Sequence, residues 1–164
     1  MQARTSALHL SGLVGGIYDC IPDASLWEPT HDDIRALCDG CLATLAVHDL
    51  PANAVRFSVA CGETQLLEPL QSSGPGDMIF YSAVPKMELD VPQTVDTIYE
   101  IQGPGMRREW LSSRLATEWA IPNHLDDFFW LPVMKQAGRV GSLVVITRTE
   151  RPQITREDLE LVTA

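Results

Sequence analysis

The chain has 164 residues, of which 45% are hydrophobic, and this length and composition suit a single domain with one core. Its 22 acidic residues outnumber its 12 basic residues, and the formal net charge of −10 argues against nucleic-acid binding by this chain itself. No apolar run is long enough for a signal peptide or a membrane span, so we expect a cytoplasmic protein without membrane contact.

The first predicted element is a helix whose apolar residues share one face, and Pro22 ends it. These residues are Leu10, Leu13, Val14, Ile17 and Ile21. Three glycines weaken this helix by roughly 1 kcal/mol each relative to alanine, so it needs packing to persist. A second helix is expected to begin at Thr30, where Thr30 and Asp33 have capping-box spacing, and to close at Asp39-Gly40.

Two strands follow, over residues 43–49 and 55–60. In the second strand, Val55, Phe57 and Val59 alternate with smaller or polar neighbours, which is the period of a strand. The connection over residues 50–53 is short, so the two strands are expected to form an antiparallel hairpin.

The stretch from 63 to 105 is the least readable, because proline and glycine interrupt every candidate element. Short strands over 78–83 and 94–99 are the expectation there. A clear helix comes next, in which Leu111, Leu115 and Trp119 stack at i, i+4 and i+8 and which Pro122 terminates.

The central hairpin is predicted over residues 127–136 and 140–147, with a turn at residues 137–139. Its first strand is apolar on both faces, so it must be covered on both sides by helices, a loop or a ligand. Pro132 predicts a bulge or an unpaired edge within this strand.

A closing helix is predicted from Thr155, which stands at capping-box spacing from Asp158 and precedes Leu159 and Val162. No helix stop signal precedes Ala164, so we expect the natural protein to continue beyond this residue.

The order of these elements resembles that of a PAS or GAF domain, which implies an α+β fold with an antiparallel sheet flanked by helices. Residues 17–27, with the letters IYDCIPDASLW, resemble the opening of the N-terminal sensor regions of LuxR-type helix-turn-helix regulators. Residues 130–159 are similar to the last hairpin and closing helix of the same regions. The resemblance implies one sensory domain over residues 1–164 and a DNA-binding domain downstream, through which alone the protein would contact DNA.

Large residues on the doubly apolar strand and near it are the candidates to line a ligand pocket. They are Tyr81, Trp110, Phe128, Trp130 and Met134. We expect a small, mostly apolar ligand whose occupancy biases the terminal helix, and packing of a ligand-free core is the competing interpretation for each residue.

A homodimer surface is predicted where the N-terminal helix meets the terminal helix. The candidates are Leu10, Leu13, Val14, Ile17, Leu159 and Val162. Burial of the N-terminal helix against the sheet of its own chain is the alternative. A dimerisation or protein-interaction module without a ligand is therefore the second functional hypothesis.

The pair Cys38 and Cys41 forms a C-x-x-C motif, with His48 and Cys61 as further ligands only if the first hairpin brings them close. The pair lies at the C-terminal end of a helix, where the dipole raises a thiol pKa, so a redox function is disfavoured. The scattered histidines match no nucleophile motif and the glycines match no phosphate loop. We expect a non-enzymatic protein with no metal and no cofactor, and reduced cysteines in the core.

Overall fold

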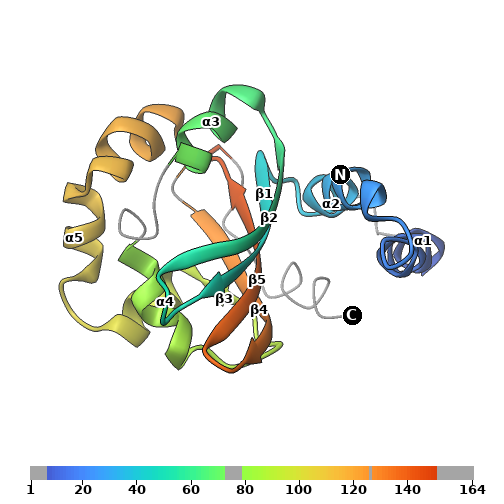
Figure 1. Ribbon diagram of the computed structural model, residues 1–164. Coiled ribbons are helices and arrows are strands. Elements are labelled where there is room, and N and C mark those ends of the chain that lie inside the picture. Colours follow the sequence, from blue (N-terminus) through green and yellow to red (C-terminus); the bar gives the residue numbers. More distant parts are fainter. Residues whose placement is uncertain (1–6, 73–78, 126, 151–164) are drawn as a thin grey trace.

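The computed structural model describes residues 7–72, 79–125 and 127–150. They form a five-stranded antiparallel sheet in the order β2-β1-β5-β4-β3, with helices on both of its faces (Figure 1). The predicted fold class, an α+β fold with an antiparallel sheet flanked by helices, is confirmed.

The sheet and its helices follow one another in a simple chain order. The helices are α1 (Ala7–Asp19), α2 (Trp27–Leu37), α3 (Thr64–Ser72), α4 (Val95–Gln102) and α5 (Met106–Ser112). The strands are β1 (Leu42–Asp49), β2 (Ala54–Gly62), β3 (Gln93–Thr94), β4 (Asp127–Gln136) and β5 (Arg139–Thr147). The 3₁₀ helices Ala24–Leu26, Ile79–Lys86 and Ile121–Asn123 and the π-helical segment Ala116–Ala120 complete the described elements.

The two predicted hairpins are present, and β1 and β5 lie side by side at the centre of the sheet. The β4–β5 turn is tight because Ala137 and Gly138 both have positive φ angles, as a two-residue turn of type I′ requires. The bulge predicted at Pro132 is confirmed, since the register of β4 against β5 shifts between Pro132 and Met134.

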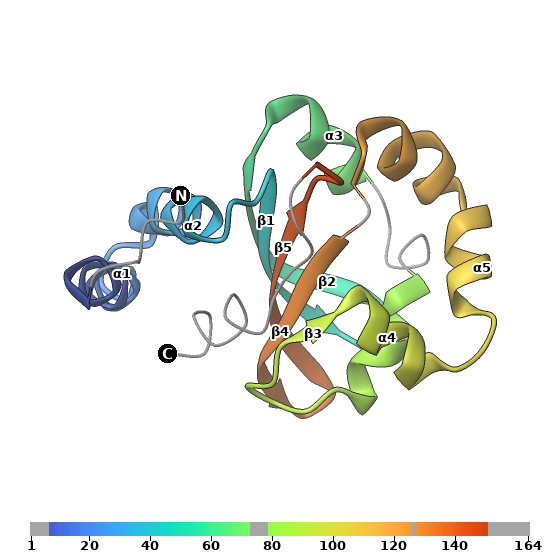
Figure 2. The same cartoon turned by 180° about the vertical axis from the view of Figure 1, so that it is seen from behind.

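The two faces of the sheet carry different layers. On one face lie α3, α4, α5 and the 3₁₀ helix Ile79–Lys86, and on the other lies α2, with α1 beyond it (Figures 1 and 2). Side chains of β4 alternate between these layers, so Phe129 packs on the side of α2 and Trp130 on the side of α4. The expectation that this strand is covered on both faces is confirmed.

Three expected elements are wrong in their type or their bounds. The helix expected to begin at Thr30 begins at Trp27, after Asp23 caps the preceding 3₁₀ turn by accepting from the Ser25 amide, and Thr30 is buried inside it. The expected strand 78–83 is part of the 3₁₀ helix Ile79–Lys86. The expected strand 94–99 is α4, because the Thr94 side chain accepts from the Thr97 amide and caps a helix.

The helix expected to run through Leu111, Leu115 and Trp119 is interrupted. α5 ends at Ser112, and Ser113 takes an extended conformation before the chain turns helical again. Because of this break, Leu111 is exposed whereas Leu115 and Trp119 are buried under α3. The predicted stop at Pro122 is close to correct, since the last helical residue is Asn123.

Candidate functional site

The candidate site is an aromatic layer between the sheet and the helices α4 and α5. Its buried members are Phe80, Ala83, Val84, Met87, Ile98, Trp130 and Val140. Half-buried side chains, among them Tyr99, Trp110 and Phe128, pack against this group. We call this set the aromatic layer.

Phe80 lies at the centre of the layer and contacts rings from three different elements. Its ring centroid is 4.7 Å from that of Trp110 on α5, 5.2 Å from that of Phe128 on β4 and 5.9 Å from that of Tyr99 on α4. Contacts of this tilted and edge-on kind stabilise aromatic pairs beyond the area they bury. Burial raises the pKa of Tyr99 to about 12, so its phenol stays protonated in the layer.

The structure brings three of the five predicted pocket residues together. Trp110, Phe128 and Trp130 all belong to the aromatic layer. The side chain of Tyr81 lies outside the described part of the structure, although its backbone belongs to the 3₁₀ helix Ile79–Lys86.

Met134 is not brought to the aromatic layer, because the bulge reverses the face on which it lies. Strict alternation would place Met134 on the face of Trp130. The register shift after Pro132 instead sets Met134 opposite Gly141, and its Cβ lies 3.1 Å from where a Cβ of Gly141 would stand. Met134 therefore lies on the opposite face of the sheet from the aromatic layer.

The prediction from sequence missed Phe80 and Tyr99. Both lie in the stretch 63–105, whose elements the sequence pattern assigned to strands. A usable signal was present, because Phe80, Val84 and Met87 recur at i, i+4 and i+7, the period of a helical face.

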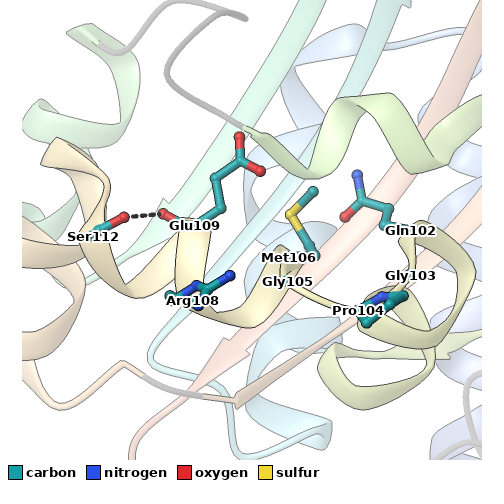
Figure 3. Close-up of a pocket in the computed structure, with 8 residues that line it drawn as sticks. All are labelled: Gln102, Gly103, Pro104, Gly105, Met106, Arg108, Glu109 and Ser112. Atoms are coloured by element: carbon teal, nitrogen blue, oxygen red, sulfur yellow. Dashed lines mark hydrogen bonds between the residues drawn. The ribbon is translucent and has the colours of Figure 1, made fainter.

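A surface pocket of about 530 Å³ opens where α4 passes into α5 (Figure 3). Its lining residues are Gln102, Gly103, Pro104, Gly105, Met106, Arg108, Glu109 and Ser112. Gly103 and Gly105 have φ angles of +96° and +113°, which glycine adopts without strain, so the sharp loop depends on both. Figure 3 shows the side chains of Gln102 and Met106 facing one another across this loop.

Gln102 joins the pocket to the aromatic layer. Its amide nitrogen donates to the carbonyl of Ile79, at 3.1 Å, and to the hydroxyl of Ser82. Its amide oxygen is buried and accepts no hydrogen bond within the described part of the chain. A buried acceptor without a donor is costly, so this oxygen is a position where a ligand could supply a donor.

Polar contacts at one rim of the sheet join the C-terminal end of β5 to the neighbouring helical segments. Arg148 forms a two-contact ion pair with Glu63, with the shorter distance 2.5 Å, and donates to the carbonyl of Asn123. The amide of Thr149 donates to the carbonyl of His124 at 2.9 Å. The indole of Trp119 donates to the carbonyl of Leu66, which ties the π-helical segment to α3. These contacts connect the helical layer to the end of β5.

The four cysteines are buried thiols. Cys38 caps the C-terminal end of α2, as expected. Burial raises the pKa of Cys41 and raises that of Cys61 to about 11, so neither thiol is activated at neutral pH. Cys61 pairs with Ala43 whereas His48 pairs with Val55, so the first hairpin holds Cys61 and His48 near opposite ends.

No cluster of three or more histidine, cysteine, aspartate or glutamate side chains suited to a metal ion occurs within residues 7–72, 79–125 and 127–150. In the same ranges, every helix falls short of the length and apolar character that crossing a membrane requires.

The dimer candidates on α1 do not lie against the sheet. Val14 and Ile17 are exposed, and Leu13 is half-buried. The side chain of Leu10, and all of Leu159 and Val162, lie outside the described part of the structure. The alternative in which α1 is buried on the sheet of its own chain is therefore wrong.

No protein-family model and no curated protein match the sequence. Among solved structures, the chain is similar to CepR2 from Burkholderia cenocepacia, an N-acylhomoserine lactone dependent LuxR-family transcription factor. The identity is 11%, over 90% of this chain and 85% of CepR2, with a TM-score of 0.57.

The chain is also similar to two GAF-domain structures. One is a GAF domain from Pseudomonas syringae pv. tomato, with 17% identity over 95% of this chain and 79% of that chain and a TM-score of 0.48. The other is a GAF domain/HD domain protein from Geobacter sulfurreducens, with 13% identity over 94% and 91% and a TM-score of 0.49. At such identities a likeness concerns the fold alone, and the likeness to CepR2 is the stronger one.

Proposed function

We propose that this chain is the ligand-sensing domain of a LuxR-type transcription regulator and that it binds a small, mostly apolar molecule in the aromatic layer. In this proposal the domain is non-catalytic and cytoplasmic, and a helix-turn-helix domain elsewhere in the protein contacts DNA. Sequencing the source gene past the codon for Ala164 tests the last point, because the reading frame should continue into a basic helical segment.

The observation that carries the proposal is the convergence of rings from three elements on Phe80. Ligand pockets are mostly apolar, with a few placed polar groups, and the aromatic layer with the buried oxygen of Gln102 has this composition. CepR2, which has a similar fold, depends on an N-acylhomoserine lactone, and this supports a ligand of related size and polarity.

The signal is proposed to leave through the rim contacts of Arg148 and Thr149. A ligand between the sheet and the helices must favour one arrangement of the helices over another if its binding is to carry information. The ion pair of Arg148 with Glu63 and the bond from Thr149 to His124 would transmit such a change to the end of β5.

The test is a thermal-shift screen of small apolar molecules, including N-acylhomoserine lactones of several acyl lengths, followed by native mass spectrometry. We expect at least one compound to raise the melting temperature of the wild-type chain. Trp110→Leu should lose this shift because it removes a ring from the layer. The matched control, Leu111→Ala on the exposed side of the same helix, should keep it.

A screen without any shift, together with a native mass equal to that of the bare chain, would overturn the proposal. A second candidate function would then take first place, a ligand-free dimerisation or interaction module. One observation favours it: the rings of the layer already contact one another at 4.7 to 5.9 Å, as they do in a filled core.

A further inference from the structure

α5 is a short helix between two breaks in the helical layer. Before it lies the loop that contains Gly103 and Gly105, whose φ angles are +96° and +113°, and after it Ser113 is extended. Figures 1 and 2 show α5 at the outside of the layer that covers this face of the sheet. Both ends of α5 are thus places where the chain can turn without bending a helix.

The polar contacts of α5 stay within its own segment. Among the described residues, every hydrogen bond of Met106–Ser112 has its partner within residues 103–113, and the charged side chains of α5 form no ion pair. The neighbouring helical segments are held differently, since Gln102 donates to the carbonyl of Ile79 and Trp119 donates to that of Leu66. No polar contact between described residues would therefore break if α5 moved away from the aromatic layer.

One side chain anchors α5 to the core. Trp110 packs against the aromatic layer, where its ring centroid lies 4.7 Å from that of Phe80, and also against the buried cluster that contains Leu115 and Trp119. In the part of the chain that the structure describes, no other α5 side chain belongs to either group. The closed position of α5 therefore depends on the packing of Trp110.

The corner between α4 and α5 is hollow. The pocket of about 530 Å³ lies at this corner, and Arg108, Glu109 and Ser112 of α5 form part of its lining (Figure 3). On the α4 side of the corner, the buried amide oxygen of Gln102 has no donor among the described residues. Water would reach this oxygen if α5 swung outward, which would remove a cost that the closed position carries. This cost offsets part of the stabilisation that the packing of Trp110 provides.

We propose that α5 is a lid over the aromatic layer, which turns at residues 103–105 and at Ser113 and which Trp110 holds closed. In the open position, Phe80 and its neighbours face solvent, and a small molecule can enter the layer beside α4. This inference rests on the proposed function for what the lid admits, whereas the movement of the lid can be tested without any ligand.

The experiment follows the reaction of N-ethylmaleimide with a thiol placed in the aromatic layer. Val84 is 0% exposed, and Val84→Cys replaces it with another small apolar side chain, whose thiol reacts when the layer opens. Cys61 is buried on the opposite face of the sheet, so its labelling reports global unfolding in the same sample. Peptide mass spectrometry gives both rates, each divided by the rate of the same thiol in the urea-unfolded chain.

We expect the thiol of Val84→Cys to react at least about tenfold faster than Cys61 after this correction, because a local opening costs less free energy than global unfolding. Low concentrations of urea should leave the rate of Val84→Cys nearly unchanged, since a local opening exposes little new surface. Equal corrected rates for the two thiols would overturn the proposal.

Two further substitutions in the Val84→Cys chain test the anchor and the loop. Trp110→Ala removes the anchor. Gly105→Ala disfavours the closed loop because alanine is strained at a φ of +113°, although its Cβ would meet no atom within 4 Å. Each should speed the labelling of Val84→Cys about tenfold and leave Cys61 unchanged. Leu111→Ala, on the exposed side of the same helix, is the matched control and should change neither rate.

The outcomes separate the lid from the sensing function. If Trp110→Ala unfolds the chain, Cys61 reacts faster as well, and the result for Gly105→Ala then decides. A rate that Gly105→Ala leaves unchanged would overturn the proposal. Fast labelling of Val84→Cys in a chain for which the thermal-shift screen finds no compound would support the lid and contradict the proposed function.

Discussion

The two faces of the sheet are packed in different ways. On the face of α2, small and aliphatic side chains and thiols surround one ring, that of Phe129. On the face of α4 and α5, rings from several elements meet, and some of them remain partly exposed. The neighbours Phe129 and Trp130 thus enter environments of opposite character.

The different packing of the two faces indicates that they have different roles. A layer of small side chains closes tightly and tolerates little change in volume, whereas a layer of partly exposed rings can rearrange around a ligand. In the proposed function the ligand binds on the face of α4 and α5, whereas the face of α2 forms the tightly packed part of the core. The following predictions test this division.

The largest expected effect is that of Phe129→Ala. Phe129 is 1% exposed, so its truncation leaves a cavity in a layer that cannot collapse, and we expect a loss of about 3 to 5 kcal/mol in the free energy of unfolding. Urea unfolding measures this loss. Phe57→Ala removes an exposed ring from β2 and should cost less than about 1 kcal/mol. Equal losses in the two variants would show that the layer under α2 is not tightly packed.

The next effect is a loss of stability in acid that originates from His31 on α2. His31 is buried, neither ring nitrogen has a hydrogen-bond partner among the described residues, and burial lowers its pKa to about 4. The unfolded chain has the ordinary histidine pKa near 6.5 and so binds more protons than the folded chain between pH 6.5 and 4. The contribution of neutral His31 to the free energy of unfolding is fully present above pH 6.5. It is lost as the pH falls to 4, which lowers the free energy of unfolding by about 3 kcal/mol.

His31→Leu should remove most of this pH dependence and keep the stability at pH 7, since no hydrogen bond is lost. His48 compares the two faces, because burial lowers its pKa too and β1 places it on the face opposite that of Ala43. A smaller slope from His48 should therefore remain in the variant. Urea unfolding of the wild type and of His31→Leu between pH 4 and 7.5 measures how the free energy of unfolding depends on pH. An unchanged pH dependence in His31→Leu would contradict the prediction.

A smaller effect distinguishes the two sides of α1. Gly12 has no atom within 4 Å of an added Cβ, so Gly12→Ala should stabilise the helix by up to about 1 kcal/mol. Gly16→Ala must displace Thr30 and should gain less or destabilise. Amide hydrogen exchange in α1 reports both changes. Equal slowing of exchange in the two variants would mean that α1 does not pack on α2 through Gly16.

The smallest effect concerns the rim on the side of α3. Glu63→Gln removes the ion pair with Arg148, and because both side chains are partly exposed we expect a loss of about 0.5 kcal/mol. The loss should vanish in 1 M salt, where charges are screened beyond about 3 Å. Urea unfolding at low and high salt measures it, and a loss that persists in salt would indicate that packing, not charge, holds the rim together.

The sequence pattern predicts the sheet well because its strands alternate or are apolar on both faces. The hairpins β1–β2 and β4–β5 and the bulge at Pro132 follow from patterns within ten residues. The consequence of the bulge does not follow, because the sequence does not say by how much the register shifts. The bulge places Met134, a pocket candidate, on the opposite face of the sheet from the aromatic layer.

The helices of the middle stretch could not be predicted in the same way. α4 contains Val95, Thr97 and Ile98, whose branched side chains favour strands. Its helical state depends on the Thr94 cap and on burial of Ile98 in the aromatic layer, a contact with distant strands. α3 was missed because Pro69 lies inside it. Tertiary packing outweighs local preference in both helices.

The outer strand β2 bears on how this protein behaves at high concentration. It is nine residues long and lies at the edge of the sheet, so one of its sides presents backbone groups to which a strand of another molecule could add. The register with β1 skips Arg56, and the guanidinium of this bulged residue pairs with Asp49 at 3.0 Å. A kink and a fixed positive charge thus interrupt the edge, which protects the folded chain from growing into fibres by sheet extension.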